Sequence, residues 1–211
     1  MKKKGLFKDA LILFAITLVA AAALSCVYSL TKEPIENAAE EAKQTAYKSV
    51  FDGANFEEIP NADTLLSTIN DAMHSGEMTD NGVSLKKATV SEILCAVDEN
   101  GAPLGYVLSV VSKSGYGGDV TAAVGVTSEG EVCGFTVLSH SETAGFGAKC
   151  DEPKEQEKYV AEYKAVFDGR KTVDQVDLIS GATYTSNALK EIFGAARVTA
   201  QTAESGVNAD A

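Results

Sequence analysis

The sequence predicts an α+β protein in which a twisted antiparallel sheet is flanked by helices and preceded by one N-terminal transmembrane helix. Three observations lead to this expectation. Residues 10–30 contain no charged residue, residues 89–140 alternate apolar and polar positions in short runs, and residues 185–203 carry apolar side chains at helical spacing. With 45% hydrophobic residues over 211 positions, the chain can bury a core of its own beside the apolar segment.

The apolar segment 10–30 is long enough to cross a membrane as a helix, which takes about 20 residues. Four lysines within residues 1–9 precede it and acidic residues follow it, so the positive-inside rule places the N-terminus in the cytoplasm and the rest outside the cell membrane. A signal peptide cleaved near Ala20–Ala23 is an alternative, as is a lipoprotein with the lipid on Cys26. The length of the apolar run favours a single uncleaved anchor.

The segment after the apolar run predicts a stalk and then a domain. Residues 31–50 place apolar side chains on one helical face and charges on the other, which indicates an amphipathic stalk helix. We expect an extracytoplasmic domain over residues 51–203 and a flexible tail over 204–211. The domain begins with a short helix near Asp63–Met73, followed by a polar loop.

Two hairpins form the predicted sheet. Residues 90–98 and 104–112 flank the turn ENGAP, and residues 120–127 and 132–140 flank the turn SEGE. Between the hairpins, the glycines of Ser114–Asp119 let the backbone turn sharply or approach a ligand closely.

The C-terminal part predicts two helices with an extended segment between them. The first helix carries Tyr159, Tyr163 and Phe167 on one face. An extended stretch over residues 173–183 then leads into the last helix, expected near Thr185–Ala203.

Composition and spacing exclude several functions. The net charge is −12, and residues 1–9 carry a local charge of +3, so the remainder carries −12 − 3 = −15 and is a poor partner for nucleic acid. His74 and His140 lack metal-ligand spacing, and no C-x-x-C pair occurs, so we predict no metal site and no catalytic residue. Cys95, Cys133 and Cys150 are expected to be buried thiols, with one disulfide among them left open.

The segment Asp177-Leu178-Ile179-Ser180-Gly181-Ala182-Thr183-Tyr184-Thr185-Ser186 is the strongest candidate for a site. A helix begins after it, and a helix N-terminus with little side-chain bulk in front holds phosphate well. The Thr183 hydroxyl lies at that point, where it could bind a phosphate or be esterified to one. The residues alone leave this interpretation balanced against a simple helix cap.

The pattern D-x-x-[ST]-G-A-T at residues 177–183 resembles the flavinylation motif of the extracytoplasmic FMN-binding domain family. Ser114–Gly118 is similar to the G-Y-G-G segment of that family, and His140–Gly147 to its H-x-E-T-P-G-L-G loop, with Ala144 in place of proline and Phe146 in place of leucine. With the single N-terminal span, residues 10–203 resemble the G subunits of Rnf electron-transport complexes, which are related to the C subunit of sodium-pumping NADH:quinone reductase.

The resemblance implies one covalently bound FMN, joined by a phosphoester to Thr183 by a dedicated flavin transferase. It implies an electron-transfer subunit of an ion-translocating ferredoxin:NAD oxidoreductase rather than an enzyme by itself, with other subunits of a membrane complex as partners. The alternatives are a solitary anchored FMN domain for another reductase and a non-redox anchored ligand-binding domain. The residues expected to bind FMN beside Thr183 are Tyr116, Glu142, Thr143, Gly145, Phe146, Gly147, Ser180, Gly181, Ala182 and Thr185.

Overall fold

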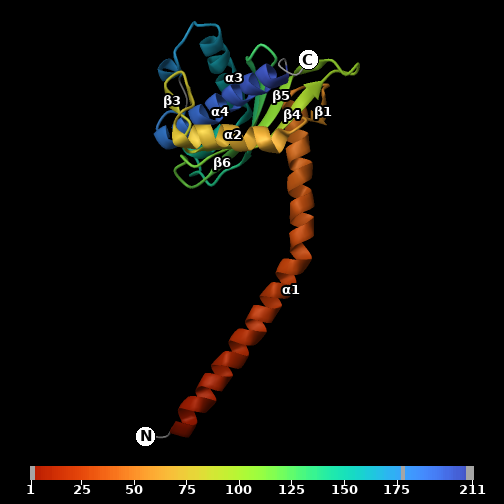
Figure 1. The fold of residues 1–211 in the computed structure, drawn as a ribbon. Coiled ribbons are helices and arrows are strands. Elements are labelled where there is room, and N and C mark those ends of the chain that lie inside the picture. Colours follow the sequence, from red (N-terminus) through yellow and green to blue (C-terminus); the bar gives the residue numbers. More distant parts are fainter. Residues whose placement is uncertain (1–2, 177–178, 208–211) are drawn as a thin grey trace. The chain divides into compact units, whose positions relative to one another are not determined.

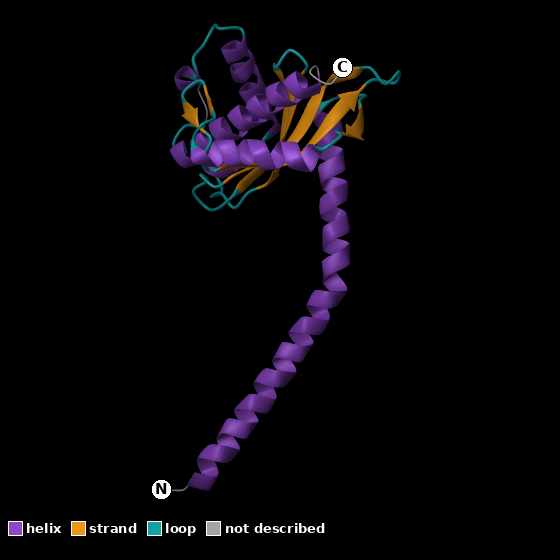
Figure 2. Ribbon diagram, viewed as in Figure 1, coloured by secondary structure: helices purple, strands orange, loops and turns teal. Residues whose placement is uncertain are grey.

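The computed structural model describes residues 3–176 and 179–207 of the chain. The chain divides into two compact units, Met1–Ala42 and Lys43–Ala211. Figure 1 colours the elements along the sequence, and Figure 2 distinguishes helices from strands.

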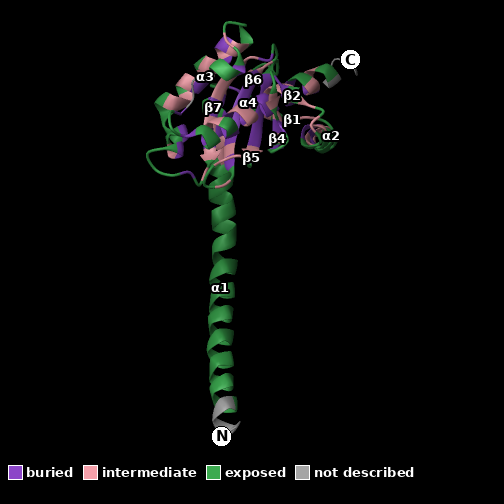
Figure 3. Ribbon diagram, turned by 90° about the vertical axis from the view of Figure 1, so that its left-hand side faces the viewer, coloured by how far each residue is buried: buried purple, intermediate pink, exposed green. Residues whose placement is uncertain are grey.

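A single helix, α1, covers Lys3–Val50, so the predicted span and the predicted stalk are one continuous element. Among its described residues it contains an 18-residue window of mean hydropathy 2.6, long and apolar enough to cross a membrane by length and composition. The large apolar side chains from Phe7 to Ile35 are exposed, as the green colour of this helix shows in Figure 3. Apolar side chains on all sides of a helix suit a hydrocarbon environment better than water.

The last two turns of α1 belong to the folded domain. Tyr47 and Val50 are buried there, in one hydrophobic cluster with Val107 and Ala123 of the sheet. The Lys43 ammonium lies 3.0 Å from a carboxylate oxygen of Glu92 on the sheet. This end of the helix therefore covers part of one face of the sheet.

The described part of the domain contains a five-stranded antiparallel sheet in the order β1-β4-β5-β6-β7. Both predicted hairpins are confirmed: β4 (Ala88–Val97) pairs with β5 (Pro103–Ser112), and β6 (Val120–Thr127) pairs with β7 (Val132–Ser139). Strands β5 and β6 also pair, with Ser112 opposite Val120. The glycine-rich segment between them is thus the loop that connects two neighbouring strands of a continuous meander.

The region before the meander has more strands than the sequence predicts. Strand β1 (Asn55–Glu58) pairs with β4 at the edge of the sheet, and its four residues, two of them acidic, lack the length that reveals a strand. Helix α2 (Ala62–Ser75) confirms the short helix. The expected polar loop contains a second small sheet, formed by β2 (Thr79–Asp80) and β3 (Val83–Ser84).

The core lies between the other face of the sheet and three helices: α2, α3 (Pro153–Phe167) and α4 (Thr183–Val207). Side chains alternate along β5, so Leu108 faces these helices while Val107 faces the end of α1. The Phe193 ring of α4 stacks on Tyr163 of α3 with ring centroids 4.1 Å apart, and lies 4.8 Å from Phe135 of β7. These aromatic contacts fix α4 across the sheet.

Two short 3-10 helices connect the larger elements. One, η1 (Gly147–Asp151), leads into α3, and the other, η2 (Val173–Gln175), replaces the start of the stretch predicted as extended. That part of the prediction was wrong because Thr172 and Gln175 form a capping box that closes the turn. Helix α4 begins at Thr183, two residues earlier than the sequence predicts.

All four cysteines lie in the described part of the chain, and all four are free thiols, so the possible disulfide is absent there. Burial raises the pKa of the Cys150 thiol to about 12, with the nearby carboxylates of Asp151 and Glu142 adding to the effect. The pKa of Cys133 is likewise raised to about 12, mainly by burial. Both groups are therefore protonated at neutral pH.

Candidate functional site

A cavity of about 480 Å³ lies where three loops of the domain meet. One is the β5–β6 loop, one is the segment after β7, and one is the turn before α4. The residues that line the cavity are Tyr116, Glu142, Thr143, Phe146, Gly147, Gly181, Ala182, Thr183, Tyr184 and Thr185. The structure thus brings together the three sequence segments that resemble the FMN-binding family.

The turn before α4 presents the Thr183 side chain to this cavity. Gly181 has φ of +80°, a conformation that residues with a side chain rarely adopt, and the Ala182 amide donates to the Ile179 carbonyl at 3.2 Å. Thr183 is the first residue of α4 and is exposed. Because the first amides of a helix lack partners within the helix, this end of α4 favours a bound anion.

The Glu142 carboxylate connects the three segments behind the cavity. One oxygen, Oε1, accepts a hydrogen bond from the Gly117 amide at 2.9 Å, and the other, Oε2, accepts one from the Thr185 hydroxyl. The Glu142 amide donates to Nδ1 of His140 at 3.1 Å. Glu142 is only 9% exposed and Thr185 only 1% exposed, so the hydrogen bond between these two side chains is shielded from water.

The close packing behind the cavity explains why position 147 is a glycine. A Cβ atom on Gly147 would lie 2.3 Å from the Thr185 hydroxyl oxygen and 2.4 Å from Oε2 of Glu142. These contacts are too short, so the two groups or the loop would have to shift to make room for a side chain. Only glycine therefore lets the loop pass across this carboxylate.

Three aromatic rings surround the mouth of the cavity. Tyr116, Phe146 and Tyr184 have exposed fractions of 72%, 58% and 63%, which is high for large aromatic side chains. The rings of Tyr116 and Tyr184 lie 5.9 Å apart between centroids. Exposed aromatic rings around a concave site suit a flat aromatic ligand that covers them on binding.

The structure places the predicted residues in different environments. Nine of those residues line the cavity, whereas the exposed Ser180 and Gly145 are absent from its lining. Thr183 and Thr185, two residues apart, differ most: Thr183 is exposed, and Thr185 is buried against Glu142. Asp177, the first residue of the predicted motif, lies outside the described residues.

One residue that lines the candidate cavity was not predicted from the sequence. Tyr184 lines the cavity and contacts Tyr116. In the sequence it stands between two threonines, whose hydroxyls were the predicted ligand groups. Its place directly after Thr183 was the available signal, because the side chain that follows the first residue of a helix also lies near the helix entrance.

Some backbone amides of the loop after β7 already donate hydrogen bonds within the loop. The amides of Phe146 and Ala148 both donate to the Thr143 carbonyl, at 3.1 and 3.2 Å, and the Glu142 amide is bonded to His140. These bonds shape the loop itself. Amides elsewhere in the loop are therefore the better candidates for contact with a ligand.

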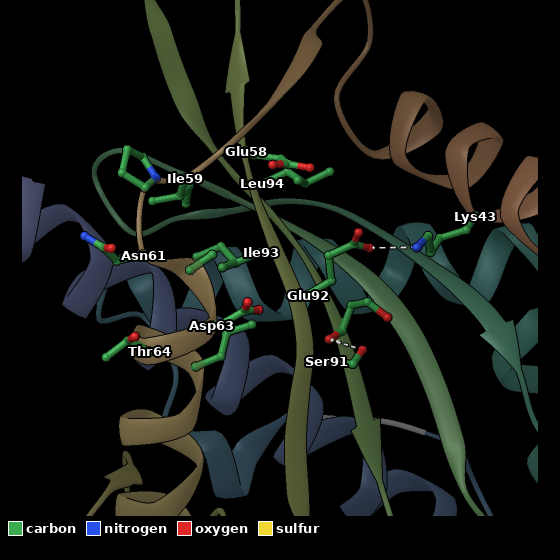
Figure 4. Close-up of a pocket in the computed structure, with 14 residues that line it drawn as sticks. Lys43, Glu58, Ile59, Asn61, Asp63, Thr64, Ser91, Glu92, Ile93 and Leu94 are labelled. Carbon is green, nitrogen blue, oxygen red and sulfur yellow. Dashed lines mark hydrogen bonds and ion pairs between the residues drawn. The ribbon is translucent and has the colours of Figure 1, made fainter.

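A larger cavity, of about 840 Å³, lies on another part of the sheet and contains none of the predicted site residues (Figure 4). It is lined by residues from the end of α1, from β1, from the start of α2, and from β4 and β5. The Lys43–Glu92 ion pair crosses it, and the Ser91 hydroxyl donates to the Ser109 carbonyl at 3.1 Å. Four of its polar lining residues thus pair with one another, Lys43 with Glu92 and Ser91 with Ser109.

Metal ligands are not grouped in the described residues: no cluster of three or more His, Cys, Asp or Glu side chains there could hold a metal ion. The 480 Å³ cavity instead offers aromatic rings, a hydroxyl and a helix N-terminus. These groups fit a flat aromatic molecule that carries a phosphate.

Comparison with protein-family models identifies two regions. Residues 115–197 match the FMN-binding domain, a range that begins in the β5–β6 loop and ends within α4. Residues 1–50 match the RnfG N-terminal region, and this range ends at Val50, where α1 also ends. The first range contains every residue that lines the 480 Å³ cavity.

Several curated proteins are similar over most of the chain. The G subunit of the Na(+)-translocating ferredoxin:NAD(+) oxidoreductase complex of Acetobacterium woodii is 28% identical, over 97% of this chain and 89% of the relative. The G subunit of the ion-translocating oxidoreductase complex of Methanosarcina acetivorans is 29% identical, over 92% and 93% respectively. The G subunit of the corresponding complex from Pasteurella multocida is 27% identical, over 85% and 86%.

Proposed function

Because the chain belongs to the family of Rnf complex G subunits, we propose that it is the membrane-anchored FMN subunit that relays electrons within an ion-translocating ferredoxin:NAD oxidoreductase complex. Bound FMN supplies the electron-transfer chemistry, and the protein supplies position and electrostatic surroundings. Other subunits of the complex deliver and remove the electrons. The chain by itself is then an electron carrier without a substrate site of its own.

The FMN is held covalently, one per chain, through a phosphoester to the Thr183 hydroxyl. The observation that carries this proposal is the contrast between the two threonines at the start of α4. Thr183 is exposed at the cavity, whereas the Thr185 hydroxyl is buried and donates to Glu142. A flavin transferase can reach the first hydroxyl but not the second, so Thr183 is the attachment point.

The start of α4 favours the phosphate of the attached cofactor. The 25-residue helix directs its N-terminal amides and its positive dipole end toward the cavity. Gly181 and Ala182 add little side-chain bulk in front of it. A phosphate esterified at Thr183 thus has favourable electrostatic surroundings without a lysine or arginine.

The aromatic rings at the cavity mouth hold the flat part of the cofactor. Tyr116, Phe146 and Tyr184 offer apolar faces that become covered when a ring system lies against them. The loop from Glu142 to Gly147 contributes four residues to the lining of the cavity. A cofactor that fills the cavity displaces water from it, which strengthens the electrostatic interactions between the cofactor and the lining.

Helix α1 anchors the domain in the cell membrane with the N-terminus in the cytoplasm and the domain outside. This orientation is supported by the lysines that precede the apolar segment. A covalent bond suits that location, since a cofactor outside the cell cannot be replaced from the cytoplasmic pool.

Co-expression of the full chain with a flavin transferase tests the attachment. We expect a fluorescent band on a denaturing gel for the wild type and no such band for Thr183→Ala. Thr185→Ser is the matched control, because serine keeps the hydroxyl that donates to Glu142, and its band should remain. A fluorescent Thr183→Ala band, or a wild type without a band in the presence of active transferase, would refute the covalent site.

A further inference from the structure

The β5–β6 loop, residues 113–119, is held in place by anchors at several points along its length. Its first amide, that of Lys113, donates to the Lys87 carbonyl at 3.0 Å. Near its other end the Gly117 amide donates to Glu142 at 2.9 Å. Tyr116 immediately precedes this second anchor and is exposed at the cavity mouth.

A third anchor comes from Glu191, a residue of α4 that lies outside the three short motifs at residues 114–118, 140–147 and 177–183. Its Oε2 accepts a hydrogen bond from the Ser112 hydroxyl at 2.6 Å, and its Oε1 accepts one from the Ser114 hydroxyl at 2.7 Å. The Ser114 amide in turn donates to the Ser112 hydroxyl at 3.2 Å. Ser112 is fully buried, so its hydroxyl depends on this carboxylate for a partner.

Glu191 lies on the same face of α4 as Tyr184. They are seven positions apart in the sequence, which is close to two full helical turns. Both also line a smaller cavity of about 390 Å³, together with Ser114. Helix α4 therefore carries three groups in a fixed relation: the Thr183 hydroxyl, the Tyr184 ring that contacts Tyr116, and the carboxylate that holds the loop of Tyr116.

We propose that Glu191 is a positioning residue that fixes the backbone on either side of Tyr116, whose ring lines the flavin cavity, before the flavin arrives. The proposal rests on the FMN-binding function proposed above. Hydrogen bonds to a carboxylate are stronger than those between neutral groups, and two of them close the start of the loop. With Glu142 holding Gly117 on the other side, the backbone of Tyr116 is restrained on both sides while its ring is free to meet the ligand.

Anchoring the loop before the ligand binds lowers the free-energy cost of binding. A loop rich in glycine has many accessible conformations, and ordering it upon ligand binding would reduce the affinity. Anchors that exist before binding remove that cost. Because both carboxylates come from segments that also line or border the cavity, the loop and the attachment site form one preorganised unit.

Hydrogen exchange of the flavin-free full chain in detergent tests the anchor without any cofactor. Glu191→Ala should speed exchange of the hydrogen-bonded amides of Lys113, Ser114 and Gly117 by about tenfold, as expected for the loss of a charge-assisted hydrogen bond. Ser114→Ala should act in the same direction although it keeps the carboxylate. Glu191→Gln should largely restore protection, and Lys190→Ala, the neighbouring helix position, should leave it unchanged.

Fluorescence of the flavin-loaded chain then reports on Tyr116. A phenol ring against a flavin quenches its emission, so Tyr116→Phe should fluoresce more strongly than the wild type. The flavin emission of Glu191→Ala should rise toward that of Tyr116→Phe. The emission of Glu191→Gln and of Lys190→Ala should match that of the wild type.

The outcomes separate this proposal from the one it rests on. Wild-type chain that takes up no flavin would overturn the FMN function and the positioning role together. If the wild type takes up flavin but Glu191→Ala changes neither the amide exchange nor the flavin emission, the positioning role alone is overturned. A similar response in Lys190→Ala would also overturn it, because the effect would then be general to α4.

Discussion

Replacing Glu142 by alanine is expected to destabilise the domain and to loosen the cavity, because this carboxylate joins the three loops that form the site. The substitution removes the acceptor of two hydrogen bonds, one from the Gly117 amide at 2.9 Å and one from the Thr185 hydroxyl. The two donors lie in different environments. Gly117 is exposed, whereas Thr185 is only 1% exposed.

The magnitude follows from that difference. The Thr185 hydroxyl loses its partner without access to water, which costs about 1–3 kcal/mol. The Gly117 amide can bond to water instead, so its loss adds little. Removing a carboxyl group that is 9% exposed also removes its own desolvation cost, which offsets part of the penalty. We therefore expect a net loss of about 1–2 kcal/mol in the free energy of unfolding.

Urea unfolding of the full chain in detergent, followed by circular dichroism, measures this loss. A double-mutant cycle with Thr185→Val isolates the hydrogen bond, since valine keeps the shape of threonine but cannot donate. The two substitutions should be coupled by about 1 kcal/mol, well above the limit within which independent sites add. Glu129→Ala, at an exposed position, is the control and should change stability by less than about 0.5 kcal/mol.

Additive effects of Glu142→Ala and Thr185→Val, within about 0.5 kcal/mol, would refute the reasoning. So would a Glu142→Ala chain as stable as the wild type. Either result would mean that the carboxylate does not hold the loops together in solution.

Three further predictions concern stability. Gly147→Ala should cost about 1–3 kcal/mol by overpacking against Thr185 and Glu142 and should lower flavin uptake, and wild-type stability in the urea assay would contradict the close contact. Arg197→Met should lower the free energy of unfolding by about 3–5 kcal/mol, because the buried Asp80 carboxylate keeps the Asn81 amide but loses its cationic partner, 2.8 Å away in the wild type. Adding Asp80→Asn should recover much of that loss. The pKa of Cys150 rises on folding from 9.0 to about 12, so the unfolded chain loses this proton first and the free energy of unfolding should fall from pH 9 upward. Cys150→Ala should show a shallower fall with pH, and equal slopes in the variant and the wild type would contradict the burial of this thiol.

Local patterns predicted much of the fold. The alternation of apolar residues within β4 to β7 and the turn signals between them predicted both hairpins correctly. The helical spacing of Tyr159 and Tyr163 likewise predicted α3. Each of these elements is long, and its own residues carry the pattern that defines it.

Short or tertiary features escaped prediction for identifiable reasons. Strand β1 exists because it pairs with Leu94–Val97, not because NFEE favours a strand. The 3-10 turn at Val173–Gln175 depends on a capping box between side chains. A four-residue or three-residue element has too few positions to show a period.

The sequence singled out nine of the ten residues that line the candidate cavity, and their roles stay predictions. The sequence singled out Thr183 through the residues around it, but it left Thr183 and Thr185 with similar local surroundings. What separates them is a contact between Thr185 and Glu142, which are 43 positions apart in the chain. The bonds of Glu191 to Ser112 and Ser114 span a still longer separation. Contacts of this kind arise only when the sheet and α4 pack together.

The most direct test of the central claim is the mass of one peptide. Trypsin cuts after Lys171 and Lys190, so the peptide 172–190 contains both threonines at the start of α4. In the full chain co-expressed with a flavin transferase, we predict that this peptide gains the mass of FMN less one water, and that fragmentation assigns the gain to Thr183. The same gain on Thr185 or Ser180, or an unmodified peptide from protein that nevertheless holds FMN, would contradict the account.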